Sequence, residues 1–240
     1  MDPRAVHWAE ALAAAALAEL VLLGRLSLDE RGGGRLTVLP GDAPSDPVLS
    51  GVLDRVRRFK KVATLAYWTD RLCRATTLRV ATAEGLVRRG VLSIRRRGGI
   101  PFFGAKELPA RDGGPEAALR ADLTKAPLRA APGARDSARL ALVVVGDLLD
   151  DVFAVVPNPE ALRRIRRTIR AHPIGRAIVD AVTALHEARA ASKTAHTRAV
   201  AANIRMALLF GAMSHQGAGF GRWVEWSKLS ERATDRKTRT

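Results

Sequence analysis

The first third of the chain alternates a long apolar segment with shorter segments of period-two polarity. Residues 5–23 are rich in alanine and leucine and contain neither glycine nor proline, which predicts a largely buried helix that ends at Gly24. Residues 25–29 and 35–39 alternate apolar and polar positions around the glycine run 32–34. That arrangement predicts a β-hairpin.

Helical patterns dominate the middle of the chain. Asp46 is placed to cap a helix over residues 47–59, which begins with a proline. A second helical pattern covers residues 65–89, with a break expected near residues 73–76. Gly90 ends this pattern, and the segments Val91–Arg95 and Ile100–Phe103 flank Gly98-Gly99, so we predict a second hairpin there.

The second half contains no strand signal that alternates with helices, so a parallel sheet is not expected. Pro115 begins a short helix, Asp136 is expected to cap a long apolar helix that reaches about Val156, and two more helices are predicted near 160–171 and 174–192. We therefore predict a mainly α fold: a helical domain with two short β-hairpins. The predicted domain covers residues 1–192, and residues 193–240 form a C-terminal helical extension with a polar tail.

One short pattern occurs twice, 66 positions apart, and each copy predicts a helix, a glycine stop, a strand and a glycine turn. The identical positions are Leu20, Val21, Gly24, Leu26, Ser27, Arg31, Gly32 and Gly33, which recur as Leu86, Val87, Gly90, Leu92, Ser93, Arg97, Gly98 and Gly99. The pattern indicates one supersecondary unit used twice; the alternative is coincidence between two ordinary helix–hairpin segments.

Charge narrows the class of partner. The 240 residues include 40 Lys+Arg and 24 Asp+Glu, a formal net charge of +16, which favours a polyanion such as nucleic acid or an anionic membrane surface. Arginine supplies 33 of the 40 basic residues, a bias that genome composition alone can produce.

Several classes of site are not expected. Cys73 is the single cysteine, and the five histidines are scattered, so we predict no disulfide, no metal site and no cofactor. Asp147 and Asp151 would share a helical face, but no second ligand motif accompanies them, and no catalytic motif is present, so we predict a protein that is not an enzyme. No segment has the roughly 20 apolar residues that span a bilayer, and a cytoplasmic location is expected.

Two groups of arginines are candidates for contact with phosphates. Arg163, Arg166, Arg167 and Arg170 form one stripe of an amphipathic helix whose opposite side is apolar. Arg95, Arg96 and Arg97 crowd the second predicted hairpin. Both groups also fit a plain solvated surface in an arginine-rich protein.

Four segments in order make the sequence similar to a known family, that of Golgi phosphoprotein 3 and its bacterial homologues of the actinobacterial type. The resemblance extends over about residues 11–190, and the four segments read ALAELVLLGRLSLD from Ala16, GDAPSDPVLSGVLDRVR from Gly41, LRVATAEGLVRRGVLSI from Leu78 and DSARLALVVVGDLLDDVFA from Asp136. The resemblance implies a mostly helical fold, no catalysis and peripheral binding to membranes that contain phosphatidylinositol 4-phosphate.

The resemblance also implies a headgroup pocket formed by a tryptophan and basic residues of the first and central helices. Arg79 matches a family arginine, whereas Thr76 and Ala13 stand where the family has basic residues. The family tryptophan falls near Arg4, and Trp8 lies one turn further along. From this resemblance we assign headgroup binding to Arg79, Thr76, Trp8, Arg4 and Arg74, with general anionic-lipid binding favoured over strict selectivity.

The family's hairpin also contributes to self-association, which here points to Phe102 and Phe103. A homo-oligomer through that hairpin, without other activity, is one alternative function. The other is a winged-helix nucleic-acid binder, with residues 78–89 as the recognition helix and the Arg95–Arg97 hairpin as the wing. Nucleic acid is disfavoured because that helix offers no Asn or Gln for adenine.

Overall fold

The computed structural model describes residues 3–29, 34–59, 61–97, 105–153 and 158–192. The chain divides into two compact units, Met1–Glu187 and Ala188–Thr240. The predicted domain boundary at residue 192 stays a prediction, and the extension 193–240, together with Phe102 and Phe103, lies outside the described residues.

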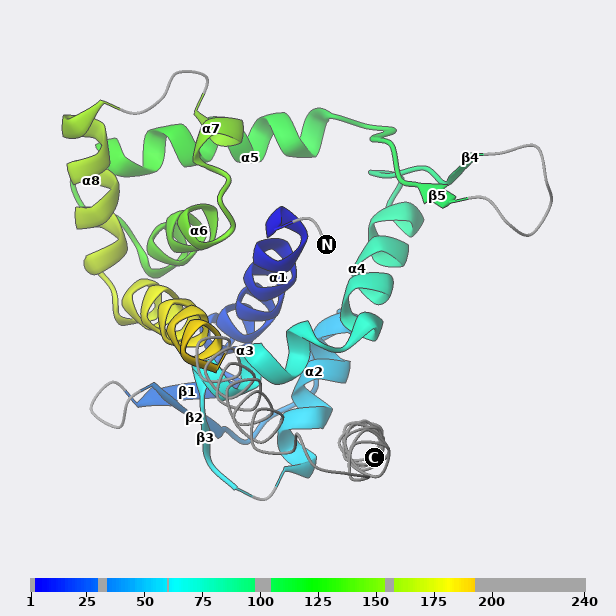
Figure 1. Cartoon of the computed structure of the whole chain (residues 1–240), viewed down its shortest axis with the longest axis horizontal. Coiled ribbons are helices and arrows are strands. Elements are labelled where there is room, and N and C mark those ends of the chain that lie inside the picture. Colours follow the sequence, from blue (N-terminus) through cyan, green and yellow to red (C-terminus); the bar gives the residue numbers. More distant parts are fainter. Residues whose placement is uncertain (1–2, 30–33, 60, 98–104, 154–157, 193–240) are drawn as a thin grey trace, which may run out of the picture. The chain divides into compact units, whose positions relative to one another are not determined.

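The first unit is mainly helical, as the sequence predicts (Figure 1). Its helices and strands follow one another as α1 (Pro3–Leu22), β1 (Leu26–Asp29), β2 (Arg35–Val38), α2 (Pro47–Arg58), β3 (Ala63–Thr64), α3 (Leu65–Cys73), α4 (Thr76–Arg88), β4 (Arg95–Arg97), β5 (Ala105–Glu107), α5 (Gly114–Lys125), the 3-10 turn η1 (Ala126–Leu128), α6 (Ala134–Val145), α7 (Leu149–Val152) and α8 (Pro159–Arg170). Residues 173–192 form the last helix of the described residues.

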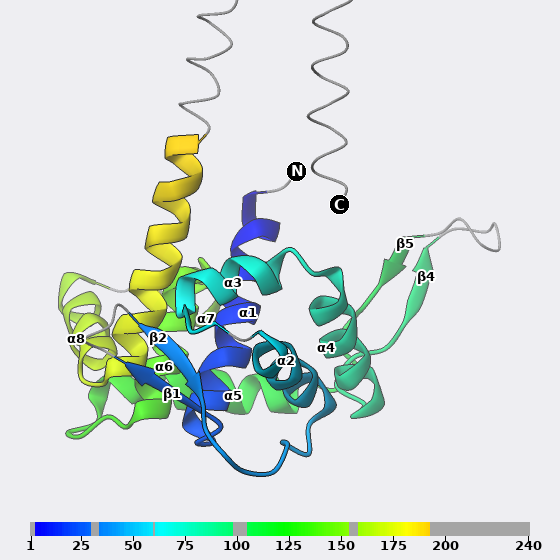
Figure 2. The same cartoon turned by 90° about the horizontal axis from the view of Figure 1, so that it is seen from below.

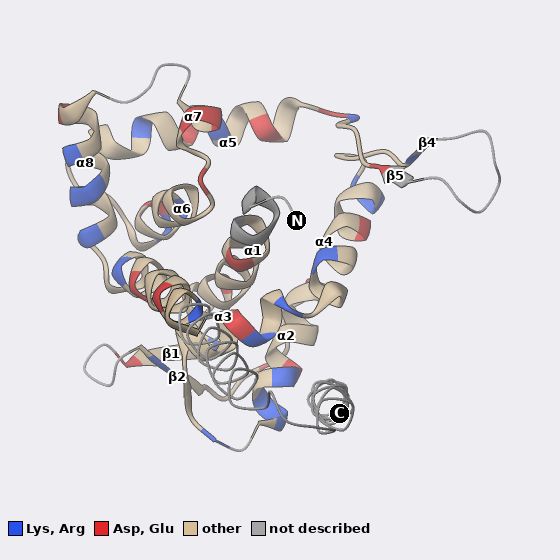
Figure 3. Cartoon of the chain, in the orientation of Figure 1, with Lys and Arg blue, Asp and Glu red and all other residues tan. Residues whose placement is uncertain are grey.

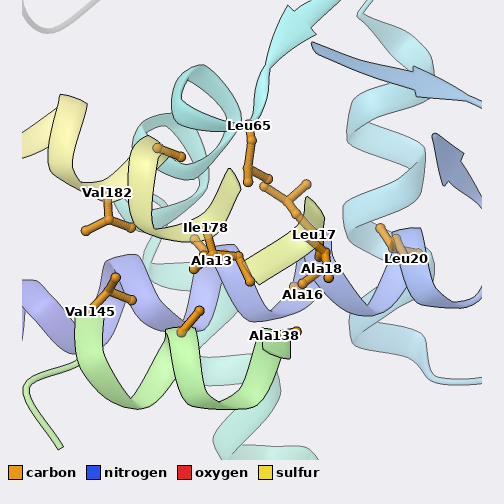
Figure 4. Close-up of a cluster of buried hydrophobic side chains, with 14 of the residues drawn as sticks. Ala13, Ala16, Leu17, Ala18, Leu20, Leu65, Ala138, Val145, Ile178 and Val182 are labelled. Atoms are coloured by element: carbon orange, nitrogen blue, oxygen red, sulfur yellow. The ribbon is translucent and has the colours of Figure 1, made fainter. Parts of the chain in front are cut away.

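Helix α1 lies at the centre of the unit, with α6 on one side and α4 on the other, and α3 packs against it (Figures 1 and 2). Its small side chains let these neighbours approach closely: Ala13, Ala14 and Leu17 have no solvent exposure. Leu65, Ala138 and Ile178 reach the same cluster from α3, α6 and the last helix (Figure 4). This all-round burial explains why the segment is apolar on every face rather than along one stripe.

A polar pair also joins α1 to the last helix. The carboxylate of Glu10 is completely buried, and its Oε2 lies 2.5 Å from Nε2 of the partly exposed His186. A buried carboxylate needs such partners, since burial without them costs several kcal/mol.

The first hairpin forms as predicted, with Leu26 opposite Val38 and Asp29 opposite Arg35. The structure adds a third strand, β3, which pairs with β2 and was not predicted because it is two residues long. The predicted capping of α2 is confirmed as well: the Asp46 carboxylate accepts hydrogen bonds from the amides of Val48 and Leu49, at 2.8 and 3.2 Å.

The repeated pattern has a structural counterpart at its helix ends. Gly24 and Gly90 both have positive φ, +65° and +76°. After α1, the amides of Gly24 and Arg25 donate to the carbonyls of Val21 and Leu20; after α4, the amides of Gly90 and Val91 donate to those of Val87 and Leu86. Both helices therefore end in the same left-handed glycine cap.

The second hairpin is displaced from its predicted position. The paired strands are β4 and β5, with Arg95 opposite Glu107, rather than Val91–Arg95 and Ile100–Phe103. Of the predicted first strand, Leu92 makes only an isolated bridge to Ala110. Pairing starts later because the amides of Val91 and Leu92 are used to close the cap of α4 on the carbonyl of Leu86.

Two predictions for the next apolar segment are wrong. The helix does not reach Val156 but ends at Val145, since Gly146 caps it and Asp147 takes a positive φ of 56°. Asp147 and Asp151 therefore do not share a helical face. Asp136 is not the N-cap either: it is the third residue of α6, and its carboxylate accepts from the amide of Gly133, the true cap, at 3.2 Å.

Asp136 also belongs to an ion-pair network at the start of α6. Arg129 donates to both Asp136 and Asp122, and Arg139 lies 2.8 Å from Asp122. Burial raises the pKa of Asp136, but the hydrogen bonds from Arg129 and Gly133 outweigh it, so the pKa lies below its ordinary value. The network ties the end of α5 and η1 to α6.

The last helix crosses α6 at Gly175, a residue without a side chain. A Cβ on Gly175 would overlap the Ser137 hydroxyl and lie 2.5 Å from the carbonyl of Ile169. That hydroxyl donates to the same carbonyl at 2.7 Å, so α6, α8 and the last helix meet at one buried contact.

Candidate lipid-binding surface

Helices α1 and α4 and the start of α2 enclose a groove of about 500 Å3. From α4 it is lined by Leu78, Thr82, Gly85 and Arg88, followed by the C-cap residue Arg89. Positions 78, 82, 85 and 89 repeat every three or four residues and so share one face. The α1 side is lined by Leu12, Ala15, Ala16 and Glu19, and the α2 side by Asp46, Pro47, Val48 and Leu49. Most of the lining is apolar, and the charged residues are two arginines, Arg88 and Arg89, and two carboxylates, Glu19 and Asp46.

Trp8 continues the groove face of α1 beyond the groove itself. It precedes Leu12 by four residues, one helical turn, and its side chain is 59% exposed. A large amphipathic ring with so much exposure is suited to the interface between water and lipid.

Arg79 follows the groove residue Leu78 on α4 and is exposed. Within the described part of the chain, its guanidinium makes neither a hydrogen bond nor an ion pair. Thr76, three residues earlier, is the exposed first residue of the helix. The two side chains share one side of α4, so the structure keeps this part of the predicted site together.

Arg74 is less suited to the role predicted for it. It stands between α3 and α4, and its side chain forms an i,i+4 ion pair with Asp70 at 2.9 Å. A pair this exposed is weak, so the arginine can exchange partners, but its charge is partly compensated.

The remaining predicted positions differ among themselves. Arg4 lies in α1, with its side chain outside the described residues. Ala13 has no exposed surface, so a basic residue there would enter the core of this chain. The Phe102 and Phe103 contact is likewise outside the described residues and stays a prediction.

Arg88 and Arg89 line the groove but were not part of the predicted headgroup site. Arg89 Nε donates to the carbonyl of Gly85 at 3.3 Å, while Glu19 opposite is held by Arg135 through two bonds of 2.9 and 3.0 Å. The spacing of Arg89 from Leu78, eleven residues or about three helical turns, would have revealed Arg89 had the inward face of α4 been known. Figure 3 shows the basic residues spread along α4.

Other classes of site find no support in the part of the chain that the structure describes. There, no group of three or more His, Cys, Asp or Glu side chains could hold a metal ion. In the same residues, no helix combines the length and hydropathy needed to cross a bilayer.

Two comparisons with known proteins complete the description. The chain has no match among the curated proteins. The sequence model described as Golgi phosphoprotein 3 (GPP34) matches residues 4–185, which covers three quarters of the chain and all the helices of the groove. The resemblance of the four segments is thereby confirmed, and the chain belongs to the Golgi phosphoprotein 3 (GPP34) family.

Proposed function

We propose that this protein is a non-enzymatic, peripheral membrane protein that binds anionic lipid headgroups, phosphoinositides among them, on the exposed surface of α4 beside the groove that it forms with α1. The observation on which this rests most is Arg79, an exposed arginine without a described partner, on the helix that the family match includes. A guanidinium in that state is free to donate two parallel hydrogen bonds to a phosphate.

Neighbouring groups supply the rest of the site. Arg88 and Arg89 add positive charge along the same helix, and each basic residue near an anionic surface is worth about 1 kcal/mol. Trp8 supplies a ring that can enter the headgroup layer from α1. Attachment by several such weak contacts is reversible, which suits a peripheral protein.

The core restricts how selective the site can be. Since Ala13 is buried and Thr76 is uncharged, neither contributes a cation to a headgroup pocket. We therefore expect modest preference for phosphatidylinositol 4-phosphate over other anionic lipids, rather than strict selectivity.

Vesicle co-sedimentation tests the proposal. Phosphatidylcholine vesicles containing either phosphatidylinositol 4-phosphate or phosphatidylserine are compared with phosphatidylcholine alone. We expect binding to both anionic vesicles and a loss of about fivefold in Arg79→Ala, since one surface contact is worth about 1 kcal/mol. Arg120→Ala on α5, paired with Glu116, removes the same charge and should bind as the wild type does.

The proposal fails if the wild type binds no anionic vesicle at low salt, or if Arg79→Ala and Arg120→Ala lose binding equally. A gel-shift titration with duplex DNA provides the contrast with nucleic-acid binding. Saturable binding at physiological salt without any lipid binding would favour the winged-helix alternative.

A further inference from the structure

Helix α8 lies apart from the groove, with α6 between it and α1 (Figure 1). Ile165, Thr168 and Ile169 face inward and are buried, whereas the arginines of the helix are exposed. The basic face of α8 is therefore separate from the site proposed on α4.

An apolar pocket of about 350 Å3 opens beside that helix. Its walls come from α6, α7, α8 and the last helix, and its apolar lining consists of Val144, Leu149, Leu162, Ile165, Ile169 and Val179. The volume lies at the lower end of the range for small-molecule sites in proteins, enough for part of an alkyl chain.

Charge at this pocket has one predominant sign. Arg166, Arg170 and Arg176 contribute to its lining, against the single carboxylate of Asp180. Arg166, Arg167 and Arg170, with Arg163, also surround an adjoining hollow of about 550 Å3 on the outer side of α8.

The arginines of α8 fall into two groups that differ in their partners. Arg163 and Arg164 lie 3.0 and 3.1 Å from the carboxylate of Glu160. Those two hydrogen bonds, from Arg164 and Arg163, hold the pKa of Glu160 below its ordinary value. Within the described residues the guanidinium groups of Arg166 and Arg170 have no such partner. Two of the arginines without such a partner, Arg166 and Arg170, therefore lie at the pocket, while Arg167 lines only the adjoining hollow.

We propose that this pocket binds an anionic single-chain amphiphile, with the alkyl chain between α6, α8 and the last helix and the anionic head on Arg166 and Arg170. The pocket is complementary to both parts of such a ligand. Its apolar lining can bury the alkyl chain, and the guanidinium groups of Arg166 and Arg170 can donate hydrogen bonds to the anionic head. A fatty acid and a lipid phosphate monoester share this chemistry. The guanidinium fork fits a phosphate especially well, so we expect the phosphate to bind more tightly.

Isothermal titration calorimetry on the full chain tests this, with dodecyl phosphate, dodecanoate and inorganic phosphate below their aggregation concentrations. Dodecyl phosphate should bind at least about tenfold more tightly than inorganic phosphate, because only dodecyl phosphate has an alkyl chain to bury against the apolar lining of the pocket. Tighter binding of dodecanoate than of dodecyl phosphate would overturn the assignment of a phosphate head.

Two double variants of α8 remove the same charge from the same helix. Arg166→Ala/Arg170→Ala should weaken dodecyl phosphate binding about tenfold or more, whereas Arg163→Ala/Arg164→Ala should change it less than about twofold. Equal losses in the two variants would show diffuse attraction and overturn the site.

A third variant tests the pocket without altering charge. Val144 lines it with a side chain that is 37% exposed, so Val144→Trp fills the space while circular dichroism reports whether the fold is kept. Binding that is unchanged in a folded Val144→Trp protein, or equal for inorganic and dodecyl phosphate, refutes an alkyl site. Vesicle binding through Arg79 should be unaffected by all three variants, which separates this inference from the proposed function.

Discussion

The two copies of the helix–glycine–strand pattern end their helices identically but lie in different surroundings. In the first copy, Leu20 and Leu26 are at most 1% exposed, and β1 belongs to a three-stranded sheet. In the second copy, Leu86 is half-buried and Leu78 is the one residue that α4 buries. The segment that corresponds to β1 makes only the isolated bridge at Leu92, and pairing in the two-stranded hairpin starts at Arg95.

The difference separates local from tertiary effects. Glycine caps are set by residues next to one another in sequence, so the same sequence gives the same cap twice. Burial depends on what packs against the helix, so the first copy builds the core while the second presents arginines at the surface. Substitutions at paired positions can test each half of this comparison.

The largest contrast is expected between Leu20→Ala and Leu86→Ala. Leu20 has no solvent exposure, so its truncation should lower the free energy of unfolding by about 2–5 kcal/mol. Leu86 is only half-buried, and its truncation should cost about 1 kcal/mol. Urea denaturation followed by circular dichroism measures both, and equal losses would mean that α4 is as much a part of the core as α1.

Asp136→Asn tests the helix against which α1 packs. Losing a carboxylate that accepts from Arg129 and Gly133 should cost about 1.5–3 kcal/mol at pH 7. Since the folded pKa lies below the unfolded value, the contribution is complete above about pH 5, one unit above the unfolded pKa, and is lost as pH falls through the folded pKa.

Stability curves of both proteins from pH 7 to pH 2 provide the measurement. The difference between wild type and Asp136→Asn should be constant above about pH 5 and shrink in more acidic solution. A difference that grows on acidification would contradict the role of the ionised carboxylate.

Equal effects are expected for Gly24→Ala and Gly90→Ala. In both, a Cβ would meet open space, so only the left-handed backbone opposes alanine, at about 1 kcal/mol. Thermal unfolding of the two variants checks this. A much larger loss of stability in Gly24→Ala would contradict this. It would show that backbone strain costs more where the cap is packed against the core than where it is exposed.

The smallest effect concerns Glu19, whose counterpart in the second copy is Gly85. Glu19→Gln should cost about 0.5–1 kcal/mol, because the bond to Arg135 is bidentate but half-exposed. The loss should diminish in high salt, which screens the pair in the wild type. Denaturation with and without 1 M sodium chloride measures this, and a salt-independent loss would point to packing instead.

Much of the fold follows from sequence because the decisive signals are local. Asp46 with Pro47 and the glycine at position 24 each specify a helix end within a few residues. The errors arise where two local signals compete. Asp136 has the chemistry of an N-cap but acts from the third position, and Gly146 ends α6 within a run that otherwise reads as helical.

The candidate site was less predictable, since it depends on which helix faces which. Arg79 and Thr76 could be placed on one side of α4 by spacing alone. By contrast, Arg89 and Glu19 line the same groove only because the fold places α1 beside α4, and the sequence does not reveal that neighbourhood. The burial of Ala13 likewise depends on tertiary packing, because alanine is common both at protein surfaces and in cores.

The close crossing at Gly175 has a consequence for how this sequence can vary over evolution. Its environment leaves no room for a methyl group, so selection for folding alone should hold glycine at this position. Gly51, inside α2 and next to open space, is under no such constraint and can drift to alanine with a small gain in stability. In a mutational library sorted for folded protein, position 175 should therefore be among the least tolerant and position 51 among the most.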